Sequence, residues 1–147
     1  MKIDKSAILI KKLALEFDKI ANPVLAEHGI TASQYRVLKF LYFQETESAR
    51  VVDIENECSI THPTALGLLE NLEKKGFVSK AVNPDDARSK IIKLTEKAMS
   101  KKDELFSLGK DLENRFTKGL NESEQKQLNE LLNKLFSSVK GGSEENK

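Results

Sequence analysis

Apolar residues recur every three or four positions at both ends of the chain, which is the period of amphipathic helices. Near the N-terminus this pattern is formed by Ile10, Leu13, Ala14, Phe17, Ile20 and Val24. It predicts a helix over residues 5–28, and Pro23 predicts a kink because proline removes one backbone hydrogen bond. Thr31 and Gln34 form a capping-box pair, which predicts a second helix that ends near Gln44.

The middle of the chain predicts two further helices joined by a turn. Residues 45–50 show no hydrophobic period and predict a loop, whereas residues 50–57 predict a short helix. The apolar stripe of that helix is Val51, Ile54 and Cys58. The next helix is predicted to begin near residue 62, because Thr61 suits an N-cap, and to end at Gly76. Its apolar stripe is Ala65, Leu68, Leu69 and Leu72.

Two β-prone runs follow and predict a hairpin. They cover residues 77–82 and 89–94, and the turn-rich connector 83–88 between them carries Arg88 at its tip. A short helix, a turn, a second helix and a hairpin in this order are typical of a helix-turn-helix followed by a wing. Such an arrangement places one helix in a DNA groove and a cation on its flank.

The last third of the chain predicts two more helices. Thr95 suits the N-cap of a long helix that continues to about Leu120, and Asn121 with Glu124 suits the start of another. The last helix carries an apolar stripe of Leu128, Leu131, Leu132, Leu135, Phe136 and Val139. Residues 141–147 are rich in Gly, Ser and Glu and predict a disordered tail.

Several segments resemble the MarR family of winged helix-turn-helix regulators. They are Leu72-Glu73-Lys74-Lys75-Gly76-Phe77-Val78, Asn83-Pro84-Asp85-Asp86-Ala87-Arg88-Ser89-Lys90, Leu94-Thr95-Glu96-Lys97 and Gly29-Ile30-Thr31. They occur at the family's spacing, and the resemblance extends over roughly residues 5–140. It implies a mainly α (α+β) fold with a single domain over residues 1–147. The DNA-binding lobe is expected at residues 31–95, and the helical dimerisation region at residues 1–30 and 96–140.

The resemblance also implies a function, namely sequence-specific binding of double-stranded DNA by a transcriptional regulator. We expect a repressor that acts as a homodimer on a palindromic operator and is released by a small aromatic or acidic effector. Phe17, Tyr35 and Phe106 are candidates for lining the effector pocket, although each could instead belong to the core. The alternative function is a winged-helix protein-interaction module without specific DNA binding.

The terminal helices favour a dimer. A winged helix-turn-helix can bury its own core, yet this chain adds long helices whose apolar sides need a partner surface. We predict dimerisation through Leu128, Leu131, Leu132, Leu135 and Phe136. A two-fold pairing would place two recognition helices about one DNA turn, ~34 Å, apart. The alternative is a monomeric helical bundle that closes on itself.

Charge and composition limit how the protein can attract DNA and which kinds of protein it can be. The net charge of the 147 residues is +1, so any attraction to DNA must come from local charge, and residues 61–97 hold seven Lys/Arg against five Asp/Glu. One cysteine excludes an internal disulfide framework. The first residues contain no long apolar run, which predicts neither a signal peptide nor a membrane span and favours the cytoplasm.

The start of the helix near residue 62 is the first candidate DNA-contacting segment. Its backbone N–H groups and positive dipole end can bind phosphate, and its side chains can reach base edges. The candidate residues are Thr61, His62, Pro63, Thr64, Leu66 and Gly67. The plain alternative is that the first four only cap the helix, and that Leu66 and Gly67 are ordinary surface.

The hairpin is the second candidate. Arg88 suits the electronegative minor groove, with Asp86 orienting it through an ion pair, and the resemblance implies the same role. Lys80, Lys90 and Arg50 are candidates for phosphate contact. The alternatives are a functionless surface Asp/Arg pair and ordinary solvated cations.

The sequence gives little support for a redox-sensing thiol, a metal site or an enzyme active site. Cys58 could be a peroxide-sensing thiol, as in some members of the family, but it ends an apolar stripe and is expected to fill the core. Neither His28 nor His62 has a second His or Cys at metal-ligand spacing, so no metal site is predicted. We find no phosphate-binding glycine loop and no nucleophile–base motif, and therefore predict neither a cofactor nor an enzyme.

Overall fold

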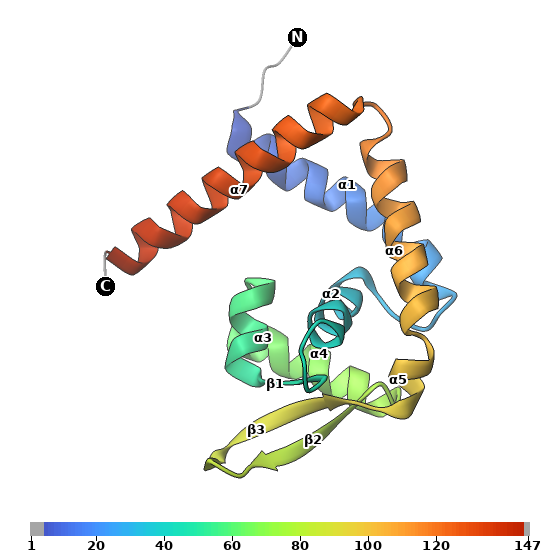
Figure 1. Ribbon diagram of the computed structural model, residues 1–147, viewed down its shortest axis with the longest axis vertical. Coiled ribbons are helices and arrows are strands. Elements are labelled where there is room, and N and C mark those ends of the chain that lie inside the picture. The colour runs from blue at the N-terminus through green and yellow to red at the C-terminus, as the bar shows by residue number, and fades with distance from the viewer. Residues whose placement is uncertain (1–4, 146–147) are drawn as a thin grey trace. The chain divides into compact units, whose positions relative to one another are not determined.

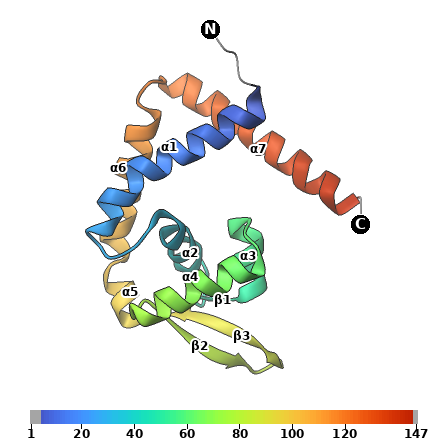
Figure 2. The same cartoon turned by 180° about the vertical axis from the view of Figure 1, so that it is seen from behind.

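The computed structural model describes residues 5–145, with side chains placed over residues 5–141. This part contains seven helices and three strands (Figures 1 and 2). In chain order they are α1 (Ser6–Ala26), α2 (Ala32–Tyr42), β1 (Ser48–Arg50), α3 (Val51–Cys58), α4 (His62–Lys74), β2 (Val78–Asn83), β3 (Asp86–Leu94), α5 (Glu96–Ser100), α6 (Lys102–Thr117) and α7 (Glu122–Glu145). They form two compact units, residues 1–110 and 111–147, whose boundary falls within α6.

Helices α1 and α2 lie within about two residues of their predicted ranges, and the turn between them has the predicted glycine and cap. Pro23 lies inside α1, and Gly29 follows the helix with a φ of +78°, a left-handed conformation that glycine adopts without strain. The capping box at the start of α2 is confirmed, because Thr31 accepts a hydrogen bond from the Gln34 backbone and the Gln34 side chain accepts one from Thr31. The chain therefore enters the winged lobe through a fixed turn.

A strand that the sequence analysis missed completes the sheet. Residues 45–50 were predicted to be a loop, but β1 pairs antiparallel with β3 and gives the strand order β1-β3-β2. Arg50 lies opposite Ile91 at the end of this pairing. Three residues are too few to display the alternation of a strand, so only the partner strand defines β1.

The hairpin is longer than predicted and its turn is tighter. Strand β2 continues to Asn83 and β3 begins at Asp86, so part of the predicted connector is paired. Val82 pairs with Lys90 and Asn83 with Asp86, which places Ala87–Ser89 in an irregular, bulged part of β3. Arg88 therefore lies on a strand and not at the tip of a loop. Figures 1 and 2 show this hairpin extending beyond α3 and α4.

The single long helix predicted after Thr95 is divided into α5 and α6. Thr95 caps α5 as predicted, accepting from the Ala98 backbone, but α5 ends at Ser100, and Lys101 is its C-cap. The Tyr42 hydroxyl donates to the Ala98 carbonyl, and Lys97 Nζ donates to the Lys75 carbonyl. These hydrogen bonds to α2 and to the end of α4 hold α5 against the lobe. They explain why the chain divides into α5 and α6 at a point where the sequence has neither proline nor glycine.

The last helix begins as predicted and ends later. Asn121 and Glu124 exchange backbone-to-side-chain hydrogen bonds of 2.9 and 3.0 Å, a complete capping box. Helix α7 then runs to Glu145, so residues 141–145 are helical where the sequence predicted a disordered tail. The predicted tail also includes residues 146–147, which lie outside the described residues.

The core of the first unit combines members of the stripes predicted for α3 and α4 with residues of α2 and of the hairpin region. Fully buried side chains include Leu38, Leu41, Ile54, Leu69, Leu72, Phe77 and Ile92. Each such side chain stabilises the fold by roughly 1.5–3 kcal/mol relative to exposure. Because these residues come from α2, α3, α4 and the sheet, they fix the positions of the two helices and the hairpin in one body.

Large apolar side chains remain exposed on two helices. On α1 they include Ile8, Leu9, Leu13 and Leu15, and on α7 they are Leu128, Leu131, Leu132, Leu135, Phe136 and Val139. Soluble chains rarely leave such a stripe uncovered, so each of these faces calls for a partner surface. Within the described residues, the length and apolar character needed to span a membrane occur in none of the helices.

Candidate nucleic-acid interface

The first turn of α4 is fixed by its cap. Thr61 Oγ1 accepts a hydrogen bond from the Thr64 backbone N–H at 3.4 Å and donates to the Thr64 hydroxyl at 3.0 Å. Pro63 lies in the first turn, where it withholds no hydrogen bond from the helix. Thr61, His62, Pro63 and Thr64 are all exposed. The predicted helix start is confirmed, and its contact with DNA stays a prediction.

His62 is held by a carboxylate that sequence reasoning missed. Its Nδ1 lies 2.9 Å from Glu55 Oε2, which reaches it from α3. The Glu55 side chain is 19% exposed and that of His62 is 60% exposed, so the inner group orients the outer one. With Nδ1 engaged, Nε2 is the ring nitrogen that can meet an external partner.

A second pair lies at the start of α3. Arg50 Nε and Nη2 each donate to Asp53 at 3.0 Å, a two-point contact that fixes the guanidinium plane. These hydrogen bonds hold the pKa of the Asp53 carboxyl below its ordinary value, against the opposing effect of partial burial. The spacing of three residues was a signal that could have revealed this pair.

The wing is shaped by two polar side chains. Asn83 is 8% exposed, and its amide donates to Ser89 Oγ at 3.1 Å and accepts from the Asp85 backbone at 2.9 Å. Asp86 Oδ1 accepts from the Arg88 backbone N–H at 3.0 Å and lies 3.5 Å from Arg88 Nε. The ion pair predicted from their spacing is confirmed. Asn83 belongs to the turn-rich connector predicted from the sequence, but its hydrogen bond to Ser89 was not predicted.

A cavity of about 510 Å³ joins these groups. Its lining includes Arg50, Glu55, His62, Leu66, Asp86, Arg88 and Lys90, which come from the start of α3, the start of α4 and the wing. Three cations face two carboxylates here, so the hollow carries a small positive excess when His62 is neutral. Five predicted residues therefore share one surface: Arg50, His62, Leu66, Arg88 and Lys90.

Other predicted residues lie outside this cavity. Lys80 Nζ is 3.9 Å from Glu73, so its charge is partly engaged on the flank of the lobe. Gly67 also lies outside the cavity, and a Cβ built on it would meet no atom within 4 Å, whereas Leu66 lines the cavity and is 41% exposed. These positions leave room for a close approach of a partner to α4.

Two of the three residues proposed for an effector pocket, Tyr35 and Phe106, pack against neighbouring glycine and aromatic residues. The Tyr35 hydroxyl lies where a Cβ on Gly109 would be, and Phe106 stands edge-on to Tyr42 with ring centroids 5.4 Å apart. The cavity described above contains neither of them, nor Phe17. Their role in effector binding stays a prediction.

Cys58 behaves as the expected core residue. It is 4% exposed, and burial raises the pKa of its thiol, although the nearby Arg36 charge acts in the opposite direction. A protonated, buried thiol reacts slowly with oxidants. Among the described residues, no cluster of three His, Cys, Asp or Glu side chains is arranged to bind a metal ion.

Comparisons with known proteins agree with this geometry. Residues 19–105 match the family described as transcriptional regulator SarA/Rot. Multiple antibiotic resistance protein MarR from Escherichia coli (strain K12) is 29% identical over 129 residues, covering 87% of this chain and 88% of MarR.

Two solved structures of DNA complexes share the fold. The crystal structure of an E. coli MarR mutant complexed with operator DNA has a TM-score of 0.79 and 28% identity, covering 88% of this chain and 91% of that one. The S. aureus MepR-DNA complex has a TM-score of 0.82 and 28% identity, covering 92% and 99%. The matched proteins are transcription regulators and not enzymes, and the resemblance seen in the sequence is confirmed. The chain therefore belongs to the SarA/Rot family of transcriptional regulators and is a winged helix-turn-helix regulator of the MarR type.

Proposed function

We propose that this regulator binds double-stranded DNA sequence-specifically as a homodimer on a palindromic operator, and that it represses transcription until a small molecule releases it. The observation that carries the proposal is the cavity that brings His62, Arg50 and Arg88 from separate elements to one surface. The solved complexes of E. coli MarR with operator DNA and of S. aureus MepR with DNA support the choice of ligand.

The roles of the residues follow from their geometry. The start of α4 presents the positive end of its helix dipole and the His62 ring to the major groove, while Arg88 reaches the minor groove beside it. Arg50 and Lys90 neutralise phosphates at the edge of the contact. Asn71 is the first Arg, Asn or Gln on α4, so few side chains there can make two-point contacts with bases. We therefore expect much of the specificity to come from DNA shape.

Dimerisation supplies the second half of the operator contact. The exposed apolar stripe of α7 and the exposed apolar residues of α1 offer surfaces that a second copy can cover, and a two-fold pairing makes the recognised sequence palindromic. Repression follows if the bound dimer occludes a promoter, and effector release follows if the ligand prefers a form with a different spacing of the two α4 helices.

Footprinting with gel-shift titration on the promoter of the protein's own gene tests the proposal. We expect a protected palindrome, and an affinity that falls with salt by a log–log slope of about −0.9 per neutralised phosphate. The matched control is a fragment of equal length with one half-site scrambled. A winged-helix protein-interaction module would protect no sequence and show no preference between the two fragments, which would contradict the proposal.

A further inference from the structure

Glu55 on α3 and His62 on α4 form a side-chain contact that joins the two helices of the DNA-binding lobe. His62 Nδ1 lies 2.9 Å from Glu55 Oε2, across the turn that separates α3 from α4. Glu55 is the less exposed member of the pair. It can therefore define the orientation of the ring that His62 presents at the surface.

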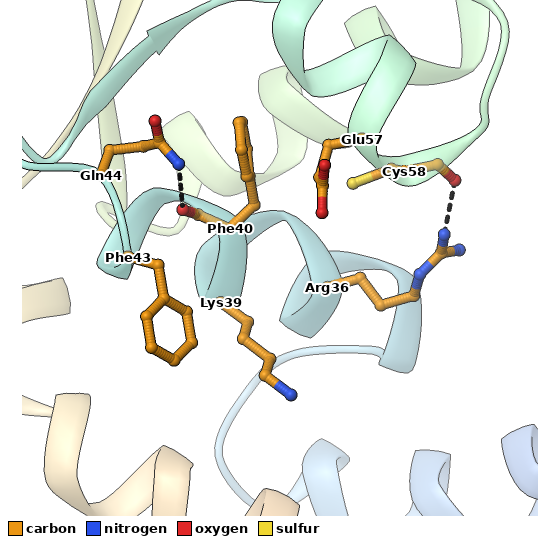
Figure 3. Close-up of a pocket in the computed structure, with 7 residues that line it drawn as sticks. All are labelled: Arg36, Lys39, Phe40, Phe43, Gln44, Glu57 and Cys58. Carbon is orange, nitrogen blue, oxygen red and sulfur yellow. Dashed lines mark hydrogen bonds between the residues drawn. The ribbon is translucent and has the colours of Figure 1, made fainter. Parts of the chain in front are cut away.

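The backbone of Glu55 is itself held in place. Its carbonyl accepts hydrogen bonds from the N–H groups of Ser59 and Ile60, the latter at 3.1 Å. Arg36 of α2 holds the same end of α3, because its Nη2 donates to the Cys58 carbonyl (Figure 3). These hydrogen bonds fix the last turn of α3, so the Glu55 side chain starts from a defined position.

The contact determines which nitrogen of the ring carries the proton. An ionised carboxylate accepts hydrogen bonds and cannot donate them, so a neutral His62 ring bonded to Glu55 carries its proton on Nδ1. The opposite tautomer would set the lone pairs of Nδ1 and Oε2 against each other at 2.9 Å. Nε2 of the neutral ring is then left as a hydrogen-bond acceptor.

The other charged side chains around the same cavity are mostly donors. Asp86, the second carboxylate of the cavity, is engaged by Arg88. The remaining charged groups are cations, which donate and cannot accept: Arg50, Arg88 and Lys90. An acceptor at His62 Nε2 therefore gives this surface a chemical capability that its cations lack.

We propose that Glu55 is a positioning residue for DNA recognition: it fixes His62 in the Nδ1–H tautomer, so that Nε2 accepts a hydrogen bond from the exocyclic amino group of an adenine or a cytosine. In the major groove these amino groups are donors, whereas N7 and O6 of guanine are acceptors. A bare Nε2 therefore favours an amino group and disfavours the guanine edge. The DNA contact rests on the proposed function, whereas the tautomer does not.

The tautomer is tested on the full chain without DNA. Heteronuclear NMR of the imidazole nitrogens, recorded at a pH where both histidine rings are neutral, should show a protonated Nδ1 and a bare Nε2 in His62. In Glu55→Ala part of the proton population should move to Nε2, because no carboxylate holds it on Nδ1. His28, the other histidine of the chain, is an internal reference and should not change. A proton on Nε2 in the parent, or identical His62 spectra in the parent and Glu55→Ala, would overturn the proposal.

Glu57→Ala is the matched control. Glu57 is also on α3, but it is exposed and lines a different cavity, beside Arg36 and Cys58 (Figure 3). Its removal should leave the His62 nitrogen shifts as they are in the parent. The parent spectrum decides the tautomer even if Glu55→Ala does not fold.

Base reading is tested with operator analogues. His62→Ala, a substitution of an exposed residue, first locates the base pair whose identity no longer affects affinity. At that pair, an analogue without the amino group (purine for adenine, 2-pyrimidinone for cytosine) should weaken parent binding about three- to tenfold, the contribution of one hydrogen bond. The loss should vanish in His62→Ala and in Glu55→Ala, a comparison that removes any effect of the analogue on base pairing. A 7-deazapurine in the same pair removes an acceptor, keeps the amino group and should bind the parent normally.

The outcomes separate this inference from the proposed function. If the 7-deazapurine weakens parent binding and loss of the amino group does not, Nε2 donates and the proposal is overturned. If the parent binds its operator but His62→Ala alters the preference at no base pair, base reading is refuted while the proposed function stands. If the parent binds no operator, the proposed function fails and base reading fails with it, whereas the NMR spectra still decide whether Glu55 fixes the tautomer.

Discussion

Arg88 is almost wholly exposed, with 94% of its side chain accessible, and Asp86 holds it at the bulge of β3. Arg88→Ala should weaken operator binding by about 1–3 kcal/mol, roughly five- to 150-fold, because it removes a cation directed at the groove. Gel-shift titration measures the loss, and sedimentation should show an unchanged oligomeric state. Arg115→Ala, the same truncation at an exposed arginine of α6, is the control. Equal affinity of Arg88→Ala and the parent would remove the wing from the mechanism.

Asp53 gives the stability of the lobe a dependence on pH. Its pKa is lowered in the folded state by the Arg50 hydrogen bonds, so the pair stabilises the fold above the unfolded-state pKa of about 3.9. That stabilisation is lost as the pH falls through the lower, folded-state pKa. Melting temperatures of the parent and Asp53→Asn should therefore differ modestly at neutral pH, since the pair is partly exposed, and converge in acid. If the difference in melting temperature between the parent and Asp53→Asn increased as the pH was lowered, this explanation would be contradicted.

Cys58 should be protected from alkylation. Its burial and raised pKa keep the thiol neutral and inaccessible, so labelling by a thiol reagent should be slow in native buffer and should follow unfolding in urea. Cys58→Ser should lower the free energy of unfolding, because it places a hydroxyl in an apolar site. Rapid labelling of the native protein would instead support the peroxide-sensing alternative.

Residue contacts were predictable from sequence only where the partners are close in the chain. The caps of Thr31, Thr61 and Thr95 each bond to a backbone N–H three residues later, so spacing alone revealed them. The partner of His62 was not found, because Glu55 reaches it from another helix. The Asn83 bond to Ser89 also crosses the hairpin, and it depends on a bulge that no residue pattern specifies.

At the scale of elements, the packing of α6 on α2 depends on one glycine. A Cβ at Gly109 would lie 1.9 Å from the Tyr35 hydroxyl oxygen. Gly109→Ala should lower the free energy of unfolding by roughly 1–3 kcal/mol, although alanine is the better helix former. Denaturant unfolding measures the change.

Gly67→Ala is the control for this substitution. A Cβ at that position meets no atom within 4 Å, so the change should stabilise the protein by roughly 1 kcal/mol through helix propensity alone. Tyr35→Phe combined with Gly109→Ala should recover part of the loss, because it removes the closest atom. Equal effects of the two alanine substitutions would show that α2 and α6 are not in contact at this point.

Helices were predicted well and the remaining elements less so. The 3.6-residue period is carried by the helix itself, so α1, α2, α4 and α7 were found from sequence alone, with small differences at their ends. Strand β1 exists only because β3 pairs with it. The division at Lys101 follows from hydrogen bonds of α5 to distant elements, which sequence periodicity does not contain.

At the scale of the whole molecule, the apolar stripe of α7 should determine the oligomeric state. Leu131 is 65% exposed and Leu135 is 46% exposed in the single chain. The pair of substitutions Leu131→Glu and Leu135→Glu should yield a folded monomer, because it places charge on the surface that a second copy would cover. Sedimentation velocity measures the state, and the monomer should bind the palindrome much more weakly than the dimer does.

Ser137→Glu is the matched control, because it introduces the same residue on the opposite side of α7. It should leave the dimer intact. If the Leu131→Glu, Leu135→Glu protein were as dimeric as the parent, α7 would not contribute the interface. If the parent itself sedimented as a monomer, the homodimer would be refuted.

The three-residue strand β1 has a consequence for how operators of this regulator can vary. Arg50 ends β1, pairs with Ile91 of the wing strand and immediately precedes α3, so the wing and the helices are anchored to each other through the backbone. The two contact points of one half-site, at His62 and Arg88, should therefore keep a constant separation in base pairs. Tolerated changes in operator length should fall only between half-sites, where the separation depends on how two copies are joined.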